Sequence, residues 1–163
     1  MEPRLVTLSE TKLIGKKMTM SFAHNRTAEL WKSFMPVRHL INNLKGSELY
    51  SVEVYGTSDF FEDFDANKTF EKWAAMSVSN YHEIPENMQT LTIPKGEYAV
   101  FDYKGKPSEA QPFYQEIYTS WFPDSGFVLD NRPHFALMGT KYKGEDPDSE
   151  EEIWIPVKRK SQI

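Results

Sequence analysis

The 163-residue sequence contains no cysteine. This absence excludes disulfides, thiolate nucleophiles, iron–sulfur clusters and cysteine-type zinc sites, and it is consistent with a reducing compartment. The sequence also lacks any run close to the roughly 20 apolar residues that a membrane-spanning helix needs. No apolar run follows the N-terminal segment 1–4, so a signal peptide is not expected either. We therefore expect a cytoplasmic protein.

Common catalytic and metal-binding motifs are missing as well. There is no Gly-rich phosphate loop, no Gly-x-Ser-x-Gly elbow and no His-Glu-x-x-His. The four histidines are far apart and have no metal-ligand spacing; they are His24, His39, His82 and His134. The acidic segment 146–150 lacks the alternation and central glycine of a calcium loop. We expect no metal ion and no cofactor.

Acidic residues outnumber basic ones, 24 to 19, and aromatic side chains are abundant. The net charge is -5, and the lysines and arginines are dispersed, so the field that attracts a phosphate backbone is missing. We do not expect direct binding to nucleic acid. Aromatic residues make up 14% of the chain, with 4 Trp, 8 Tyr and 11 Phe. That number is enough to form a core and still line a small-molecule site.

Hydrophobic periodicity predicts one series of elements that occurs twice. The first series consists of strands at 4–8 and 12–22, a helix at 27–43, and strands at 49–55 and 70–78. Pro36 should interrupt the helix, because proline has no backbone donor. The second series consists of strands at 88–93 and 97–103, a helix at 109–122, and strands at 135–142 and 151–157.

Short stretches of the two halves also match in sequence. The segment 29–36 shares its Glu, Ser and Pro with 116–123, and Glu71-Lys72-Trp73 aligns with Glu152-Ile153-Trp154. An internal duplication accounts for these matches. We predict an α+β fold that forms a single domain over 1–163. It would contain two strand-helix-strand-strand repeats with pseudo-two-fold symmetry, about 3–80 and 86–158.

In this predicted fold each repeat has an antiparallel sheet with a helix on one face. The uncovered faces of the two repeats would enclose a ligand cleft between them. Along the last strand, Ile153 and Ile155 face one way, and Glu152 and Trp154 face the other. The aliphatic side belongs under a helix, so the carboxylate and the indole should face the cleft. The repeat places Trp73 likewise.

A carboxylate flanked by indoles suits a flat, apolar cation, because each ring face adds cation–π attraction of roughly 0.5–2 kcal/mol. The predicted ligand-binding residues are Glu152, Trp154, Trp73, Tyr118, Trp121, Phe34 and, with the same facing as Glu152, Glu150. Structural roles for these residues remain open. The acidic run 145–152 is also typical of a solvated loop entering a strand, and the aromatic residues equally suit a core.

Several segments of the chain resemble those of a known protein family. The segments 132–139 and 146–157, together with 70–75 and 118–123, are similar to the GyrI-like effector-binding domains, including integron-associated and AraC-type members. The resemblance covers the whole chain. It implies a drug-binding cleft between two repeats, with a carboxylate in an aromatic pocket. That carboxylate comes from the last strand, two residues before another pocket residue, which corresponds to Glu152 and Trp154.

Many relatives carry a DNA-binding helix-turn-helix before this domain, whereas here the domain starts at residue 3. We therefore expect any transcriptional control to act through a protein partner. Three functions remain open. The first is a stand-alone protein that senses or sequesters hydrophobic, often cationic or aromatic compounds. The second is a hydrolase of electrophilic small molecules that uses Glu152 as general acid or base. The third, protein interaction or haem carriage, has little support from the histidines.

Overall fold

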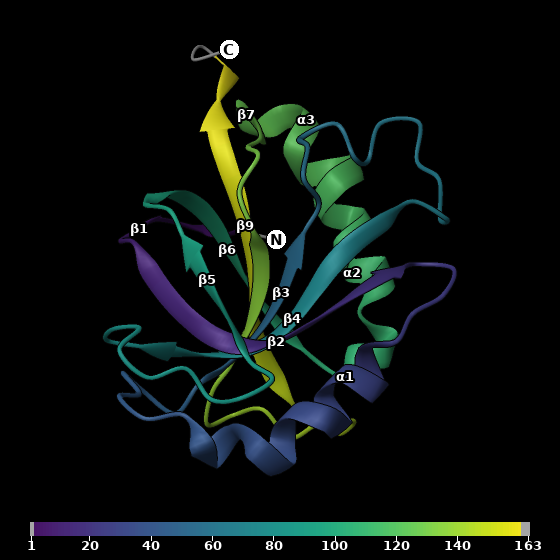
Figure 1. Ribbon diagram of the computed structural model, residues 1–163. Coiled ribbons are helices and arrows are strands. Elements are labelled where there is room, and N and C mark those ends of the chain that lie inside the picture. Colours follow the sequence, from purple (N-terminus) through teal and green to yellow (C-terminus); the bar gives the residue numbers. More distant parts are fainter. Residues whose placement is uncertain (1, 161–163) are drawn as a thin grey trace.

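The computed structural model describes residues 2–160, which form one antiparallel sheet of nine strands with helical segments on one face (Figure 1). The sheet order is β1-β6-β9-β8-β3-β4-β2-β5, and β7 pairs with β9. The strands are β1 Arg4–Leu8, β2 Thr11–Ser21, β3 Leu49–Val54, β4 Thr69–Val78, β5 Gln89–Ile93, β6 Gly96–Lys104, β7 Phe127–Leu129, β8 His134–Met138 and β9 Glu150–Arg159. Over these residues, no helix has the length and apolar character required to cross a membrane.

The two halves contribute strands in the same spatial order. The first half contributes β2-β4-β3 and the second β6-β9-β8, and the ladder between β3 and β8 joins them. The α+β class is therefore confirmed, and the antiparallel sheets predicted for the two repeats are continuous in one sheet. Both helical segments cover the same face. Directly paired residues of neighbouring strands face the same side of the sheet, and one such row runs from Ile153 through Ala136 and Ser51 to Ala74. Ile153 at one end of the row packs with the second helical segment, and Ala74 at the other end packs with the first.

The first helical segment changes type where its sequence predicts an interruption. Helix α1, Thr27–Phe34, buries Leu30 and Phe34, which lie four residues apart on one face. It continues as the 3-10 helix Met35–Leu40, with Pro36 in its first turn. Proline lacks the donor that a further α-helical turn requires, so the predicted interruption is confirmed.

The second helical segment also departs from regular α-helix. Beyond a short 3-10 turn, Pro107–Glu109, helix α2 spans Gln111–Glu116. A π-helical turn, Ile117–Trp121, follows, and α3 spans Phe122–Ser125. Within α-helical segments, π-helical turns occur frequently at functional sites. This turn carries the predicted residue Tyr118.

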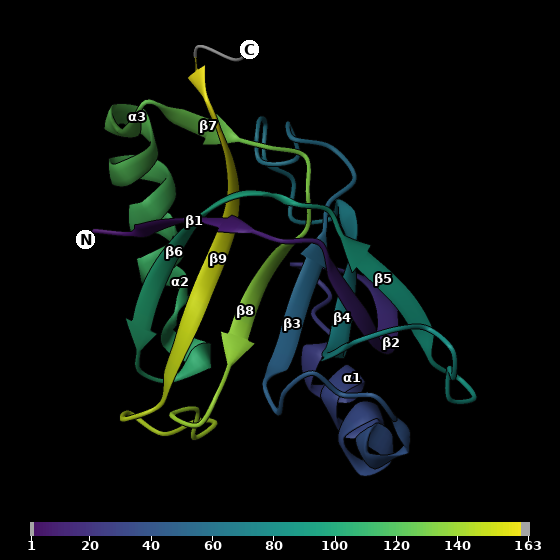
Figure 2. The ribbon, with the colours of Figure 1, turned by 90° about the vertical axis from the view of Figure 1, so that its left-hand side faces the viewer.

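The face away from the helices is covered by the chain itself. Residues 4–8 pair with 96–100 and residues 11–15 pair with 89–93 in one common register, so β1 adds to β6 and β5 adds to β2. Figure 2 shows β1 crossing in front of β9. Side chains of this two-stranded ribbon, among them Leu13 and Tyr98, pack on Trp73 and Phe135. The face that the sequence predicts to be open therefore holds a buried core, because each repeat lends its first strand to the other.

The ribbon leaves the sheet at Gly15, which pairs with both β5 and β4. A Cβ atom at this position would lie 2.6 Å from the Cα of Ala75 and closer still to the carbonyl oxygen of Ala74. Both of these are backbone atoms, so the strand itself would have to shift. We expect Gly15→Ala to lower the free energy of unfolding by about 2–3 kcal/mol, measured by urea denaturation.

The matched control is Gly139→Ala. A Cβ at Gly139 would meet only the Cγ of Glu48, at 4.0 Å. We expect that substitution to change the free energy of unfolding by less than about 0.5 kcal/mol. Equal effects of the two substitutions would contradict the close approach at Gly15.

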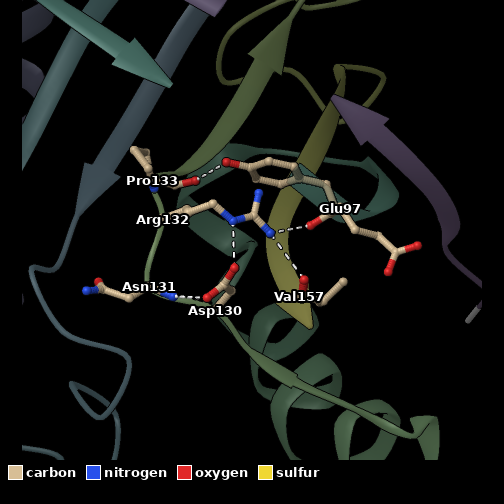
Figure 3. A network of polar contacts seen from close by, with 7 residues as sticks. Glu97, Asp130, Asn131, Arg132, Pro133 and Val157 are labelled. Atoms are coloured by element: carbon tan, nitrogen blue, oxygen red, sulfur yellow. Dashed lines mark hydrogen bonds and ion pairs between the residues drawn. The ribbon is translucent and has the colours of Figure 1, made fainter. Parts of the chain in front are cut away.

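An arginine ties the ribbon to the sheet and to the segment that leads into β8 (Figure 3). The Nε of Arg132 donates to Asp130 Oδ2 at 2.8 Å, and its Nη2 donates to the carbonyl oxygens of Glu97 at 2.7 Å and Val157 at 3.1 Å. The guanidinium lies over the ring of Tyr98, 4.8 Å from its centroid. One side chain therefore links β6, β9 and the start of β8.

Candidate functional site

The candidate site lies on the helix-covered face, around the junction of β3 with β8. One cross-strand row there consists of small side chains, namely Ala74, Ser51 and Ala136. The next row consists of Lys72, Glu53 and His134. Glu151 on β9 faces the same way, because it is two residues from Ile153. Charged and polar groups from four neighbouring strands therefore share this face.

Two of these groups form an ion pair. Lys72 Nζ lies 2.8 Å from Glu53 Oε1, and the two side chains are only 11% and 19% exposed. Glu151 is close enough to respond to both charges. Burial raises the pKa of Glu151 to about 7, and the charge of Glu53 adds to this, whereas Lys72 acts in the opposite direction. Near neutral pH the Glu151 carboxyl therefore exchanges between its charged and neutral forms.

Tyrosine side chains surround these charges. Burial raises the pKa of Tyr118 above its ordinary range, and the negative charge of Glu53 contributes further. The same two causes act on Tyr114 and Tyr55. Because the pKa values of all three tyrosines are raised, their hydroxyls stay neutral. All three residues are half-buried, so part of each still contacts solvent.

His134 adds a neutral ring beside Tyr55. The two rings meet edge to face, with centroids 4.9 Å apart. Burial lowers the pKa of His134 to about 3, and the charge of Arg132 acts in the same direction. The imidazole is therefore uncharged at neutral pH and does not add to the positive charge of Lys72. We refer to Glu53, Tyr55, Lys72, Tyr114, Tyr118, His134 and Glu151 as the inter-helix cluster.

The loop 55–68 between β3 and β4 packs against the inter-helix cluster. Phe61 stacks on Tyr118, with ring centroids 5.2 Å apart and planes 27° apart. Phe64 lies beside Phe61, and Phe22 contacts Phe64 at 5.6 Å. Phe22 and Phe64 are 41% and 53% exposed. Exposed rings that adjoin one another are typical of binding surfaces.

The predicted carboxylate Glu152 lies on the opposite face. Its Oε1 accepts a hydrogen bond from Trp154 Nε1 at 3.1 Å, and its Oε2 pairs with Arg4 at 2.9 Å. Glu71 repeats this arrangement, accepting from Trp73 Nε1 at 3.1 Å and pairing with Lys17 at 3.2 Å. The repeated Glu-x-Trp sequence therefore makes the same local contacts in both halves.

The aromatic residues predicted for the site are distributed among several clusters. Trp73 is 2% exposed within the core under the ribbon, and Trp154, half-buried, stacks on Phe135 at 5.1 Å. Phe34, the last residue of α1, is fully buried in the core cluster that includes β4. Trp121 packs edge to face on Phe101 of β6. The remaining predicted residues are Glu150, which begins β9, and Tyr118, which lies in the inter-helix cluster.

The sequence prediction does not include most residues of the inter-helix cluster. For one of them, Glu151, the alternation along its strand does indicate which face it occupies. Glu151 alternates in phase with Ile153 and Ile155, and the sequence places those two under a helix. The same alternation puts Glu151 on the helix side. Glu53 and Lys72 had no comparable signal, because their contact depends on the register between β3 and β4.

A separate hollow lies at one end of β2 and β3, away from the inter-helix cluster. Its lining includes Glu10, Lys12, Lys45, Glu48 and Ser77 and is mostly polar. Such a lining offers little apolar surface to an organic ligand. Across the described span 2–160, no three His, Asp or Glu side chains converge as a metal site would require.

Comparisons with known proteins agree on the fold. The family model of the GyrI-like small molecule binding domain matches residues 1–158. SAV2435, whose structure was determined with tetraphenylphosphonium bound, is similar over 97% of this chain and 94% of its own, with 20% identity and a TM-score of 0.72. A putative transcription regulation protein from Staphylococcus aureus MU50 is similar over 97% and 99%, with 20% identity and a TM-score of 0.68.

An integron cassette protein from Vibrio cholerae is similar over 96% of both chains, with 14% identity and a TM-score of 0.70. At these identities the structural neighbours establish the fold. No curated protein sequence matches the chain significantly.

Proposed function

The chain belongs to the GyrI-like small molecule binding domains, and on that basis we propose that it binds hydrophobic aromatic cations at the inter-helix cluster. The observation that carries the proposal is the state of Glu151. Its carboxylate is half-buried among tyrosines, and no side chain between residues 2 and 160 pairs with it. A half-buried carboxylate without a partner is available to a cation from outside.

The surrounding groups suit a lipophilic monocation. Glu53 and Glu151 contribute two negative charges when ionised, and Lys72 contributes one positive charge, which leaves an excess of one negative charge. Tyr114 offers an aromatic ring that attracts a cation by roughly 0.5–2 kcal/mol, whereas the ring of Tyr118 stacks on Phe61 and Phe122. The tetraphenylphosphonium complex of SAV2435 supports this ligand class. Tetraphenylphosphonium is therefore the probe that we use below.

We expect tetraphenylphosphonium to bind about tenfold more tightly at pH 8 than at pH 6. The pKa of Glu151 is about 7, so its carboxyl is mostly neutral at the lower pH and cannot pair with a cation. Affinity should rise with pH as the proton leaves and then reach a plateau. His134 has a pKa of about 3 and does not titrate in this range. Isothermal titration calorimetry across the pH series measures the change.

Triphenylphosphine oxide, a neutral compound with similar rings, is the control for this pH series. Its affinity should not vary over the same range, because it carries no charge for Glu151 to meet. Calorimetry near pH 7 in two buffers of different ionisation enthalpy should also detect proton release when the cation binds. A pH-independent affinity for the cation would contradict the role of Glu151.

Hydrolysis of an electrophilic small molecule is a second candidate function. A carboxyl group with a pKa of about 7 has the value that suits general acid and base catalysis near neutral pH. In this alternative Glu151 protonates the leaving oxygen of a strained electrophile, or activates the water that attacks it. Turnover of an aryl epoxide that Glu151→Gln abolishes would support hydrolysis. Stoichiometric binding without product would exclude it for that substrate.

We also propose that the protein senses or sequesters its ligands in the cytoplasm, as a single domain over 1–163. We propose further that any effect on transcription is exerted through a protein partner. The net charge of -5 supports this, because it disfavours contact with a phosphate backbone. Tight binding of the purified protein to duplex DNA at physiological salt would contradict the proposal.

A further inference from the structure

Lys72 is an unusual residue for a site that binds cations. Its residue surface is 8% exposed, and lysines are seldom so buried unless they are paired. Its ammonium group meets Glu53 Oε1 at 2.8 Å, and the backbones of the two residues are direct partners in the β3–β4 ladder. The pair therefore lies inside the inter-helix cluster, where the ligand's own charge would be placed.

The fold does not require a cation at this position. The Glu-x-Trp repeat aligns Lys72 with Ile153, and each of the two lies between a glutamate and a tryptophan on its strand. Ile153 is 1% exposed and packs under the second helical segment. An aliphatic side chain thus occupies the equivalent position in the other half, which points to a functional reason for the charge of Lys72.

The charge of Lys72 changes what the site can accept. Without it, Glu53 and Glu151 would present two carboxylates to the same ligand. With it, Glu53 is already paired, and Glu151 is the carboxylate that remains available. A second positive centre on a ligand would lie close to the lysine ammonium, and like charges at short range in a half-buried site repel strongly.

We propose that Lys72 is a specificity-determining residue, an internal cation that occupies Glu53 and restricts the inter-helix cluster to ligands with a single positive charge. This inference rests on the proposed function. It commits the site to aromatic monocations that pair with Glu151, and it identifies dications as the class that the site rejects.

The test compares three probes on wild type and Lys72→Met by calorimetry at pH 8.5, above the pKa of Glu151. We expect Lys72→Met to raise the affinity for tetraphenylphosphonium about tenfold and that for an aromatic bisamidine dication about 100-fold. The affinity for triphenylphosphine oxide should stay within about twofold. Lys72→Arg keeps the charge and should keep the wild-type order of affinities.

A double variant, Lys72→Met with Glu53→Gln, serves as the matched control. It removes the freed carboxylate together with the lysine, so both cations should return to about their wild-type affinities. If Lys72→Met does not fold, Lys72→Gln removes the same charge and can still donate a hydrogen bond to Glu53. The same ranking of probes is expected for that variant.

The outcomes separate this inference from the proposed function. Equal changes for all three probes would show that only the size of the side chain matters and would overturn the inference. Unchanged affinities in Lys72→Met and Lys72→Gln would also overturn it. In either case the proposed function stands if wild type binds tetraphenylphosphonium through Glu151. Failure of wild type to bind that cation at all would instead defeat the proposed function.

Discussion

Glu151→Gln is expected to lower the affinity for tetraphenylphosphonium about 30- to 100-fold, whereas Glu152→Gln should leave it within about twofold. The two glutamates are neighbours in sequence and point to opposite faces of β9. Glu151 faces the tyrosines of the inter-helix cluster without a partner. Glu152 is held by Arg4 and by the indole of Trp154. The pair of variants therefore tests which face of the sheet binds the ligand.

The expected size follows from electrostatics. An ion pair about 5 Å apart at an effective dielectric constant of about 20 is worth about 3 kcal/mol. Desolvation of the carboxylate and the cation offsets part of that attraction. Glutamine keeps the size of the side chain and removes only its charge, so loss of packing does not contribute.

Calorimetry at pH 8 with both variants measures the effect, and thermal unfolding of each variant confirms that the fold is intact. Affinity for the neutral triphenylphosphine oxide should be the same in wild type and in both variants. The opposite pattern, a large loss in Glu152→Gln and none in Glu151→Gln, would place the ligand on the ribbon side, as the sequence predicts.

Local sequence signals predict the elements of this fold well. Alternation along the last strand identifies Ile153 and Ile155 as the side that lies under a helix, and both are 1% exposed there. The end of α1 follows from Pro36, because the missing donor acts within one helical turn. Strand alternation and the effect of a proline each depend on only a few neighbouring residues, so a single sequence is enough to predict them.

The cover of the opposite face depends on partners far apart in the chain. Residues 4–8 pair with 96–100 and residues 11–15 pair with 89–93, and neither segment shows by its own pattern which strand it will join. Three features of Trp73 and Trp154 favour a ligand site in the sequence analysis: they are aromatic, they share a face of their strands with a glutamate, and they occur in a repeated sequence. All three features also fit side chains that pack beneath a ribbon.

The inter-helix cluster illustrates the same limit at the level of single contacts. Lys72 and Glu53 meet because β3 and β4 pair in one particular register. A shift of one residue would turn one of them to the other face. Of the residues that the sequence predicts for the site, Tyr118 also lies in the inter-helix cluster, and its role in binding stays a prediction. Neighbouring charges on other strands become visible only once the sheet is assembled.

The ribbon itself provides the second large prediction, through the arginine that fastens it. Arg132 is 10% exposed at its side chain and pairs with Asp130 at 2.8 Å. Its Nη1 is buried and has no hydrogen-bond partner among the residues described, and a Cβ at Gly96 would collide with that atom. The planar group fits closely against Gly96 and the ring of Tyr98. Neither a longer residue at 96 nor a flexible ammonium at 132 reproduces this arrangement.

Arg132→Met is expected to lower the free energy of unfolding by about 3–5 kcal/mol, because it removes the hydrogen bonds that Arg132 donates to Asp130 Oδ2 and to two strand carbonyls. For a chain of this size that corresponds to a fall of about 10 °C or more in the unfolding temperature. Arg132→Lys restores a charge without the fork geometry and should recover less than half of the loss. Calorimetric melting at pH 7 measures all three proteins.

The control is Arg26→Met, which removes an exposed pair with Glu29 on the first turn of α1. The unfolding temperature of that variant should stay within about 1 °C of wild type, because solvent screens such pairs. If Arg132→Met melts no lower than Arg26→Met, the ribbon is held by its apolar contacts alone. Ribbon attachment would then depend on side chains such as Leu13 and Tyr98, and the arginine would only occupy the space beside Gly96.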